Sequence, residues 1–222
     1  MNDLLGLERM VLFTPEVLVD LHGRLNGDLW PLHVLTLALA ALLLARAWWA
    51  RPADEPFAGC VMAGFWLWLG IGYFTNARAE VDWMAPYVAA AFILQGALLT
   101  WFGVVRGSLD FTAARPMPRG MGALLALFAI AGYPLLAWVF GAETAALPSV
   151  GLLPGPTVLF TLGVMLMARP SWVLIVLPLS WAIVGAALGW VLGMWADLAL
   201  LISAGAVLSG RGYPSRWSPD RR

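Results

Sequence analysis

The sequence has no lysine, one cysteine and two histidines among 222 residues, and only 12% of its residues are charged. The single cysteine, Cys60, excludes a disulfide within the chain. His22 and His33 are separated by about 16 Å along a continuous helix, which is too far for both to ligate one metal or haem. There is no CxxC or HExxH motif either, so we expect neither a metal nor another cofactor.

Catalytic residues are also scarce. Three serines could act as nucleophiles, but none has a basic partner nearby in the sequence; they are Ser149, Ser180 and Ser203. The sequence therefore does not favour an enzyme, and we expect no nucleic-acid partner.

Long apolar runs are abundant instead, since 61% of the residues are hydrophobic. A helix needs about 20 residues to cross the hydrocarbon of a bilayer, and a β-barrel would alternate polar and apolar residues in segments of about ten. Seven continuous runs fit helices: 31–49, 57–74, 83–105, 120–141, 153–168, 172–192 and 194–209. We predict an all-α membrane bundle of seven transmembrane helices.

The chain is predicted to form one domain, 1–210, followed by a flexible cytoplasmic tail, 211–222. Residues 1–30 precede the first span and form an amphipathic segment. Thr14 and Pro15 fit a helix start, and Val17, Leu18, Leu21 and Leu25 share one face. We expect this helix to lie on the outer surface or to fold over the bundle.

The arginines predict the orientation. With seven spans and the N-terminus outside, ten of the 13 arginines lie on the cytoplasmic side. Tryptophans fall at the predicted ends of spans, as expected at an interface, and only Trp66, Trp68 and Trp181 fall near the middle. We therefore predict a bacterial inner-membrane protein with a periplasmic N-terminus and a cytoplasmic C-terminus.

A few polar groups fall inside the predicted spans. Gln95 is central in the third span, where its amide needs a partner or a cavity. Tyr133 and Trp181 lie at a similar depth, so we predict a polar core or solute pathway there. Asp197 falls in the first turn of the last span, where a carboxylate interacts favourably with the helix dipole.

The motif Pro154-Gly155-Pro156 interrupts the predicted fifth span. The 13 residues from Pro156 to Ala168 make only about 20 Å of helix, too little to cross the hydrocarbon. We therefore expect a broken helix that begins at Pro156 or Thr157, with its amino end below the outer interface and covered by protein. Thr157 and Thr161 share a face, and we expect their hydroxyls to point towards Tyr133 or Trp181. The alternatives are local thinning of the membrane and burial of the turn by the amphipathic segment.

Gly185 and Gly189 form a GxxxG motif in the sixth span. Such a motif allows close helix packing, either within the chain or between two copies. A homodimer or a larger membrane complex could associate through it, in addition to the surrounding lipid bilayer.

Several stretches together resemble a family of bacterial multi-pass membrane proteins known only as a domain of unknown function. They are "LNGDLWP", "FILQG", "GYPLL" and "PGPTVLFTLG". Family members usually carry Cys, Gln and His where this chain has Gly155, His33 and Phe74. The resemblance implies the fold and topology, and it implies no reaction.

Two functions lead from the sequence, and an intramembrane enzyme comes third because no catalytic pair is visible. The broken fifth span and the polar groups at one depth favour a small-solute or ion permease, or a subunit of one. A non-catalytic subunit that packs against a larger membrane complex is the alternative. A water-accessible cavity that reaches Gln95 would favour transport, whereas a dry bundle would favour the subunit.

Overall fold

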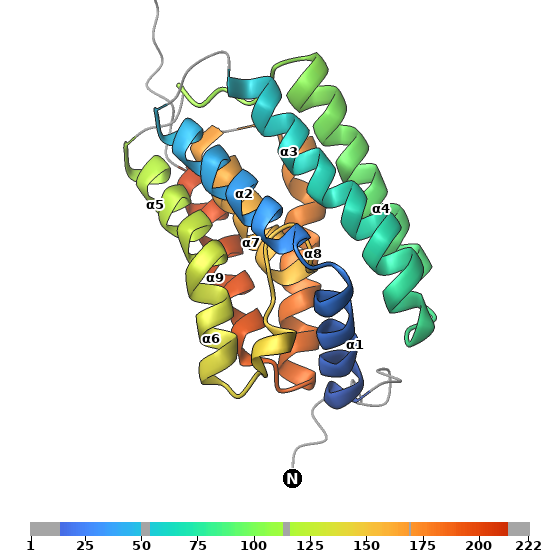
Figure 1. The fold of residues 1–222 in the computed structure, drawn as a ribbon. Helices are drawn as coiled ribbons and strands as arrows, with labels where there is room; N and C mark the ends of the chain where they lie inside the picture. Colours follow the sequence, from blue (N-terminus) through green and yellow to red (C-terminus); the bar gives the residue numbers. More distant parts are fainter. Residues whose placement is uncertain (1–13, 50–53, 113–115, 169, 213–222) are drawn as a thin grey trace, which may run out of the picture.

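The computed structural model describes residues 14–49, 54–112, 116–168 and 170–212, and these residues contain helices and no strand (Figure 1). The prediction of an all-α fold is confirmed. The α-helices are α1 (Pro15–Asp28), α2 (Leu32–Trp49), α3 (Glu55–Trp68), α4 (Ala85–Leu98), α5 (Pro116–Leu127), α6 (Tyr133–Val139), α7 (Pro154–Ala168), α8 (Trp172–Val191) and α9 (Ala199–Gly212).

Shorter segments continue or connect them. Three are π-helical: η3 (Leu69–Ala77), η5 (Leu99–Val105) and η6 (Phe128–Gly132). Three are 3₁₀ turns: η4 (Arg78–Glu80), η7 (Thr144–Ala146) and η8 (Trp195–Leu198). The last helix continues to Gly212, two residues into the predicted tail, and residues 213–222 lie outside the described residues.

Five continuous helices are long and apolar enough to cross a membrane: Leu32–Trp49, Glu55–Glu80, Ala85–Val105, Pro116–Val139 and Trp172–Val191. They correspond to five of the seven predicted spans. The other two predicted spans are the shorter apolar helices Pro154–Ala168 and Trp195–Gly210. Helix length therefore supports five crossings and does not establish seven.

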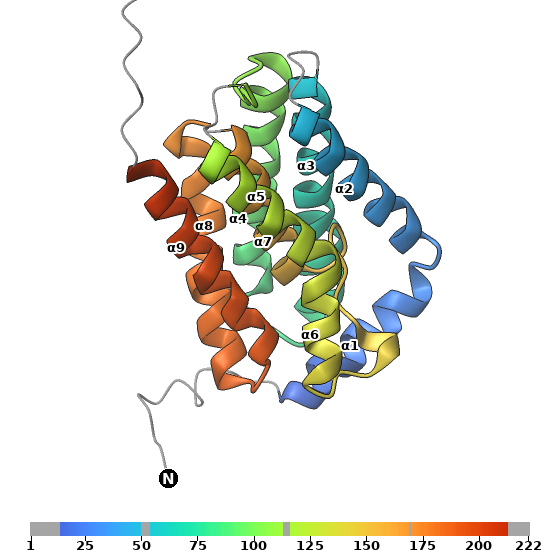
Figure 2. The ribbon, with the colours of Figure 1, turned by 90° about the vertical axis from the view of Figure 1, so that its left-hand side faces the viewer.

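The shortest of these apolar helices, α7, lies at the centre of the bundle (Figures 1 and 2). All of its residues from Gly155 to Ala168 are buried. A helix that is apolar on every side is buried either in lipid or in a protein core, and the contacts of α7 with α2, α5, α8 and α9 place it in the core. The core of the protein therefore forms around α7.

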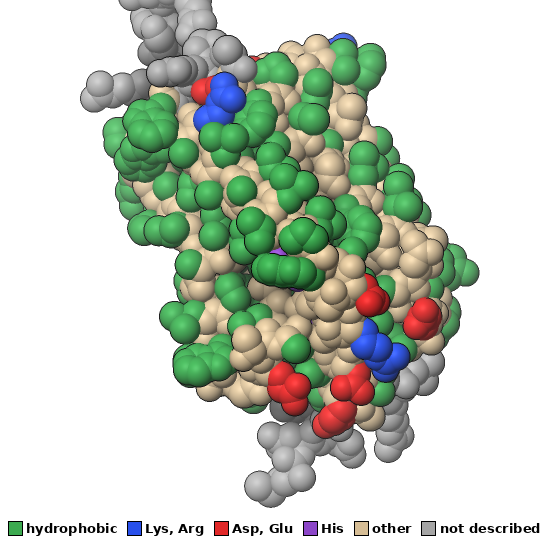
Figure 3. Space-filling view, viewed as in Figure 1, with side chains coloured by type: hydrophobic (Ala, Val, Ile, Leu, Met, Phe, Trp, Pro, Cys, Tyr) green, Lys and Arg blue, Asp and Glu red, His purple; other side chains and the backbone are tan. Residues whose placement is uncertain are grey.

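The two ends of the bundle differ. Helix α1 lies at one end, and α9 finishes at the opposite end (Figures 1 and 2). On the face in Figure 3, apolar side chains cover the middle and acidic ones gather at the α1 end. The predicted interfacial tryptophans that the structure describes are all exposed: Trp30, Trp48, Trp49, Trp83, Trp101, Trp138, Trp172, Trp190 and Trp195. This surface is compatible with insertion into a membrane.

Helices α5 and α7 touch through glycines. A Cβ atom on Gly163 would lie 2.7 Å from the Gly122 carbonyl oxygen, and one on Gly122 would meet the Gly163 carbonyl oxygen. Since these obstacles are backbone atoms, a side chain on either residue would push the two helices apart.

We therefore expect Gly122→Ala to lower the stability of the detergent-solubilised protein by about 2 kcal/mol, as overpacked cores do. The matched control is Gly64→Ala, because Gly64 is exposed in α3 and has nothing within 4 Å of its added Cβ. Thermal unfolding should separate the two variants. Equal melting temperatures would contradict the backbone contact.

Candidate functional site

A cavity of about 230 Å³ lies at the α1 end of the bundle. Its walls come from α1, η3, η4, α6, α8, the first turn of α7 and the segments that precede α7 and α9. Most of the lining is apolar. The polar side chains on it are His22, Tyr73, Arg78, Tyr133 and Asp197.

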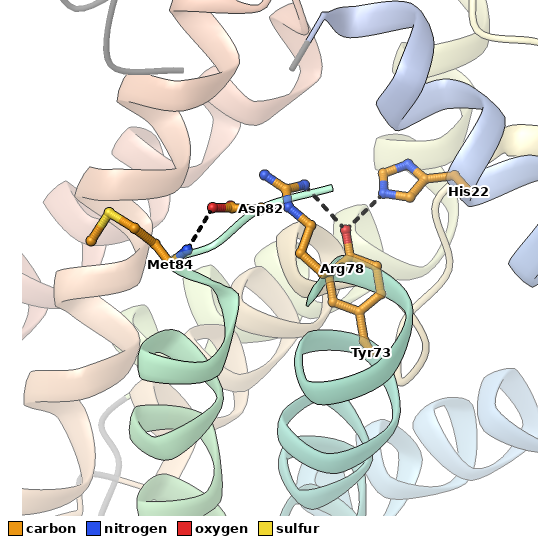
Figure 4. Close-up of polar contacts among 5 residues, drawn as sticks. All are labelled: His22, Tyr73, Arg78, Asp82 and Met84. Carbon is orange, nitrogen blue, oxygen red and sulfur yellow. Dashed lines mark hydrogen bonds and ion pairs between the residues drawn. The ribbon is translucent and has the colours of Figure 1, made fainter. Parts of the chain in front are cut away.

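Three of these residues form a hydrogen-bonded chain (Figure 4). The Tyr73 hydroxyl lies 3.0 Å from His22 Nε2 and accepts a hydrogen bond of 3.5 Å from Arg78 Nη1. Because Arg78 only donates, the hydroxyl proton is available to His22 Nε2. Arg78 Nε in turn donates to the Asp82 carboxylate at 3.3 Å. A buried arginine is thus paired at the edge of the cavity.

His22 is uncharged in this arrangement. Burial lowers its pKa to about 3, and the positive charge of Arg78 adds to the effect. The sequence did not reveal that a neutral His22 bonds Tyr73, although His22 lies one turn after Leu18 on the predicted apolar face. Val17, assigned to that face, is exposed instead.

Helix α1 folds over the bundle, which is one of the two predicted arrangements. Besides the bond from His22, Asn26 Nδ2 donates to the carbonyls of Ala145 and Leu147 at 2.9 and 3.0 Å, and His33 lies 3.0 Å from Asn26 Oδ1. Leu18 and Leu21 pack with Leu192 beside the cavity. Helix α1 therefore covers the cavity.

Tyr133 and Asp197 form the second polar corner. The Tyr133 hydroxyl donates to the Asp197 carboxylate. Asp197 lies in η8, at the start of the last helix as predicted, but its carboxylate faces another helix. It lies 2.9 Å from the position of a Cβ on Gly155, in the first turn of α7. A carboxylate there is favoured by the dipole of α7.

Helix α7 begins at Pro154, so the prediction of a start at Pro156 or Thr157 is wrong by about two residues. Proline fits the first turn of a helix because its missing N–H would be unpaired there, so the motif Pro154-Gly155-Pro156 forms that turn. Gly155 and Pro156 are buried. The amino end is thus covered by protein, as predicted.

The predicted direction of the threonine hydroxyls is wrong. Thr157 Oγ1 donates to the Leu153 carbonyl at 2.7 Å and accepts from the Gly151 amide at 2.8 Å. Thr161 Oγ1 donates to the Thr157 carbonyl and accepts from Trp66 Nε1 at 3.0 Å. Threonine in a helix readily bonds the carbonyl one turn back, which holds both hydroxyls away from Tyr133 and Trp181.

Gln95 is fully buried, and its Nε2 donates to the Leu174 carbonyl at 2.9 Å, which confirms the predicted bond between helices. Its Oε1 has no partner among the described residues. Gln95 does not line the cavity, whereas Tyr133, Trp181 and the motif Pro154-Gly155-Pro156 do. The predicted polar core is therefore divided between two places.

Gly185 and Gly189 face the inside of the bundle. A Cβ on Gly185 would lie 3.0 Å from Leu200, and one on Gly189 would lie 2.9 Å from Asp197 Oδ2. The motif thus serves packing within the chain, and association of two copies through it stays a prediction. Across the described ranges, no group of three His, Cys, Asp or Glu residues could hold a metal ion.

The low pKa of His22 predicts a pH dependence. In the docked helix His22 stays neutral down to about pH 3, whereas undocked it takes up a proton near pH 6.5. Docking of α1 should therefore weaken as the pH falls from 6.5 towards 3, by about 2 kcal/mol at pH 5. Hydrogen exchange of the amides of residues 15–28, corrected for the pH dependence of the intrinsic exchange rates, measures how far docking weakens. His22→Gln should remove the dependence; the same loosening in that variant would contradict this origin.

Gln95→Leu should change stability by less than about 1 kcal/mol. The variant loses the bond to Leu174 but also removes a buried carbonyl oxygen that has no partner among the described residues. Phe92→Ala, in the same helix, should cost about 3 to 5 kcal/mol because it opens a space in the core. Thermal unfolding in detergent compares them. A loss for Gln95→Leu as large as for Phe92→Ala would be the contrary result.

No curated protein and no solved structure matches the chain. A family model described as a family of unknown function, DUF6064, matches residues 16–209, in agreement with the resemblance seen in the sequence. The chain therefore belongs to DUF6064.

Proposed function

We propose that this protein is a small-solute permease of a bacterial inner membrane, or the membrane subunit of one, and that the cavity under α1 is its solute site. The cavity carries the proposal, because it brings polar groups together inside an otherwise apolar bundle. The five long apolar helices and the exposed tryptophans support the membrane location.

The orientation follows from the charges. In this proposal the α1 end faces the periplasm and the α9 end faces the cytoplasm, where most arginines then lie. The cavity opens on the periplasmic side, beneath α1. Seven crossings require α7 and α9 to complete the bundle although each is short, which the burial of α7 within the bundle allows.

The size and chemistry of the cavity suit a small molecule. A cavity of about 150 Å³ accommodates benzene, so 230 Å³ accommodates about nine non-hydrogen atoms. Arg78 and Asp197 place opposite charges on its wall. The amino end of α7 also lies at the cavity. Broken helices point their ends at solute sites in transporters in the same way.

A specific observation supports the alternative of a non-catalytic subunit. Gln95 lines neither this cavity nor the second one found in the structure, and its amide is bonded to Leu174. The cavity thus stops short of the centre of the third predicted span. A permease must open a further path past α7, whereas a structural subunit needs none.

Cysteine labelling tests the cavity. In a Cys60→Ser background, Ala146→Cys places a thiol on the cavity wall, and Ala126→Cys places one in the core of α5, away from it. A charged, membrane-impermeant methanethiosulfonate added to the periplasmic side should label the Ala146→Cys variant and spare the Ala126→Cys variant. Labelling of both or neither would contradict an accessible cavity.

Transport is measured on the same variant in proteoliposomes. Swelling in glycerol, urea or glycine, followed by light scattering, should exceed that of protein-free liposomes and fall when the Ala146→Cys variant is labelled. A cavity that is labelled without any solute flux would favour the subunit.

A further inference from the structure

A second cavity lies between α4 and α8. It has a volume of about 280 Å³, and Trp66 of α3 contributes to its wall. Helix α4 contributes Tyr87, Val88, Ala91 and Phe92, and α8 contributes Leu177, Ser180, Trp181 and Val184. We call it the α4–α8 groove. The Ser180 hydroxyl donates to the Val176 carbonyl at 2.8 Å, so the groove offers almost no unmet polar group.

The groove borders the apolar surface of the bundle. Val184, Ile183 and Val176 of α8 are exposed beside it. In a membrane such a groove is filled by hydrocarbon rather than by water, because water needs several polar partners at a site. An alkyl chain suits it better than a polar solute.

Trp181 lines both the groove and the cavity under α1. The centroid of its ring lies 5.3 Å from that of Phe74 on the cavity wall and 5.0 Å from that of Phe92 on the groove wall. Both ring pairs are edge to face. In the part of the chain that the structure describes, no hydrogen bond holds its indole N–H. Gly185 follows one turn later and leaves space beside the indole nitrogen. Apolar packing and ring contacts, without a hydrogen bond among the described residues, therefore keep Trp181 in place between the two spaces.

We propose that the cavity and the α4–α8 groove together bind one long-chain amphiphile, with its polar head in the cavity and its chain in the groove. Trp181 moves aside to join the two spaces. This inference rests on the proposed function only in that the cavity is a ligand site, and it names the class of ligand.

The polar groups of the cavity identify the head. Asp82 compensates the charge of Arg78 at 3.3 Å. The Asp197 carboxylate accepts from Tyr133, the one described residue that donates to it, and retains lone pairs for another donor. The head is therefore a hydrogen-bond donor, a hydroxyl or an ammonium group, and about nine non-hydrogen atoms fit the volume. A glycerol ester meets both conditions.

The probe is a monoacylglycerol with a diazirine in its acyl chain, added to the full protein in phosphatidylcholine liposomes. After irradiation, mass spectrometry locates the labelled residues. We expect labels on Val88, Ala91 or Val184 in the groove. The methyl ester of the same fatty acid lacks the donor and should label there about tenfold less, the loss expected for one hydrogen bond to a charged group.

Two variants test whether the acyl chain of the probe lies in the groove. Ala91→Trp fills the groove and should abolish its labelling, whereas Ala97→Trp adds the same side chain to an exposed position of α4 outside the groove and should not. An ethanolamine-headed analogue distinguishes an ammonium from a hydroxyl head; labelling by either one at the groove supports the proposal.

Equal labelling by the ester and the monoacylglycerol would overturn the proposal, because it indicates surrounding lipid only. Labelling that survives Ala91→Trp would overturn it too. If the Ala146→Cys variant is still labelled from the periplasmic side in that case, the small-solute site stands and only the amphiphile is wrong. If that thiol is also inaccessible, both proposals fail.

Discussion

The burial of α7 is the constraint on which the rest of the structure depends. Its 15 residues are apolar on every side and span only about 22 Å. A helix this short cannot cross the hydrocarbon alone, so its ends need cover by protein, since unpaired backbone groups in hydrocarbon cost several kcal/mol each. The glycine contact with α5 brings one neighbour to backbone distance. Where α7 ends short of the bundle, other segments have to fill the remaining length.

The cavity is a consequence of that filling. Two elements approach the amino end of α7: the segment that precedes it in the chain, and η8. Helix α1 folds across both. Two π-helical segments contribute as well. Tyr73 lies within η3, and Tyr133 directly follows η6. A π-helical turn changes the direction in which the following side chains point, and such turns occur often at functional sites. Both tyrosines line the cavity.

Properties that depend on a single helix could be predicted from the sequence. The apolar runs gave the helices, and the indole side chains at their ends are exposed because they are amphipathic. The bond of Gln95 was predictable because a buried amide needs some partner, although Leu174 could not be named. Contacts between distant segments were beyond reach. His22 and Tyr73 are 51 residues apart, and only the fold of α1 over the bundle joins them.

Two errors had local causes. The start of α7 was placed at Pro156 or Thr157 because the motif Pro154-Gly155-Pro156 was treated as an interruption, whereas proline fits the first turn of a helix. Thr157 and Thr161 were predicted from their spacing to point towards Tyr133 or Trp181, but each hydroxyl bonds the carbonyl four residues before it. Helical spacing defines which residues share a face, and it does not define which acceptor a hydroxyl chooses.

Arg78 connects the lining of the cavity to helix α1 through Tyr73 and His22. A buried ion pair contributes little net stability compared with apolar residues of similar size, because desolvation offsets the attraction. Arg78 lies in η4, four residues before Asp82, so the pair is local to the turn between η3 and α4, and α3 and α4 already pack through apolar and glycine contacts. What Arg78 adds is a positive charge beside Tyr73 and His22. Burial keeps His22 neutral and that charge adds to the effect, and neutral His22 can accept the hydrogen bond from the Tyr73 hydroxyl that anchors α1. Arg78 thus acts through Tyr73 on α1, which covers the cavity. A change of charge in the cavity would affect α1 through the same residues, Arg78, Tyr73 and His22.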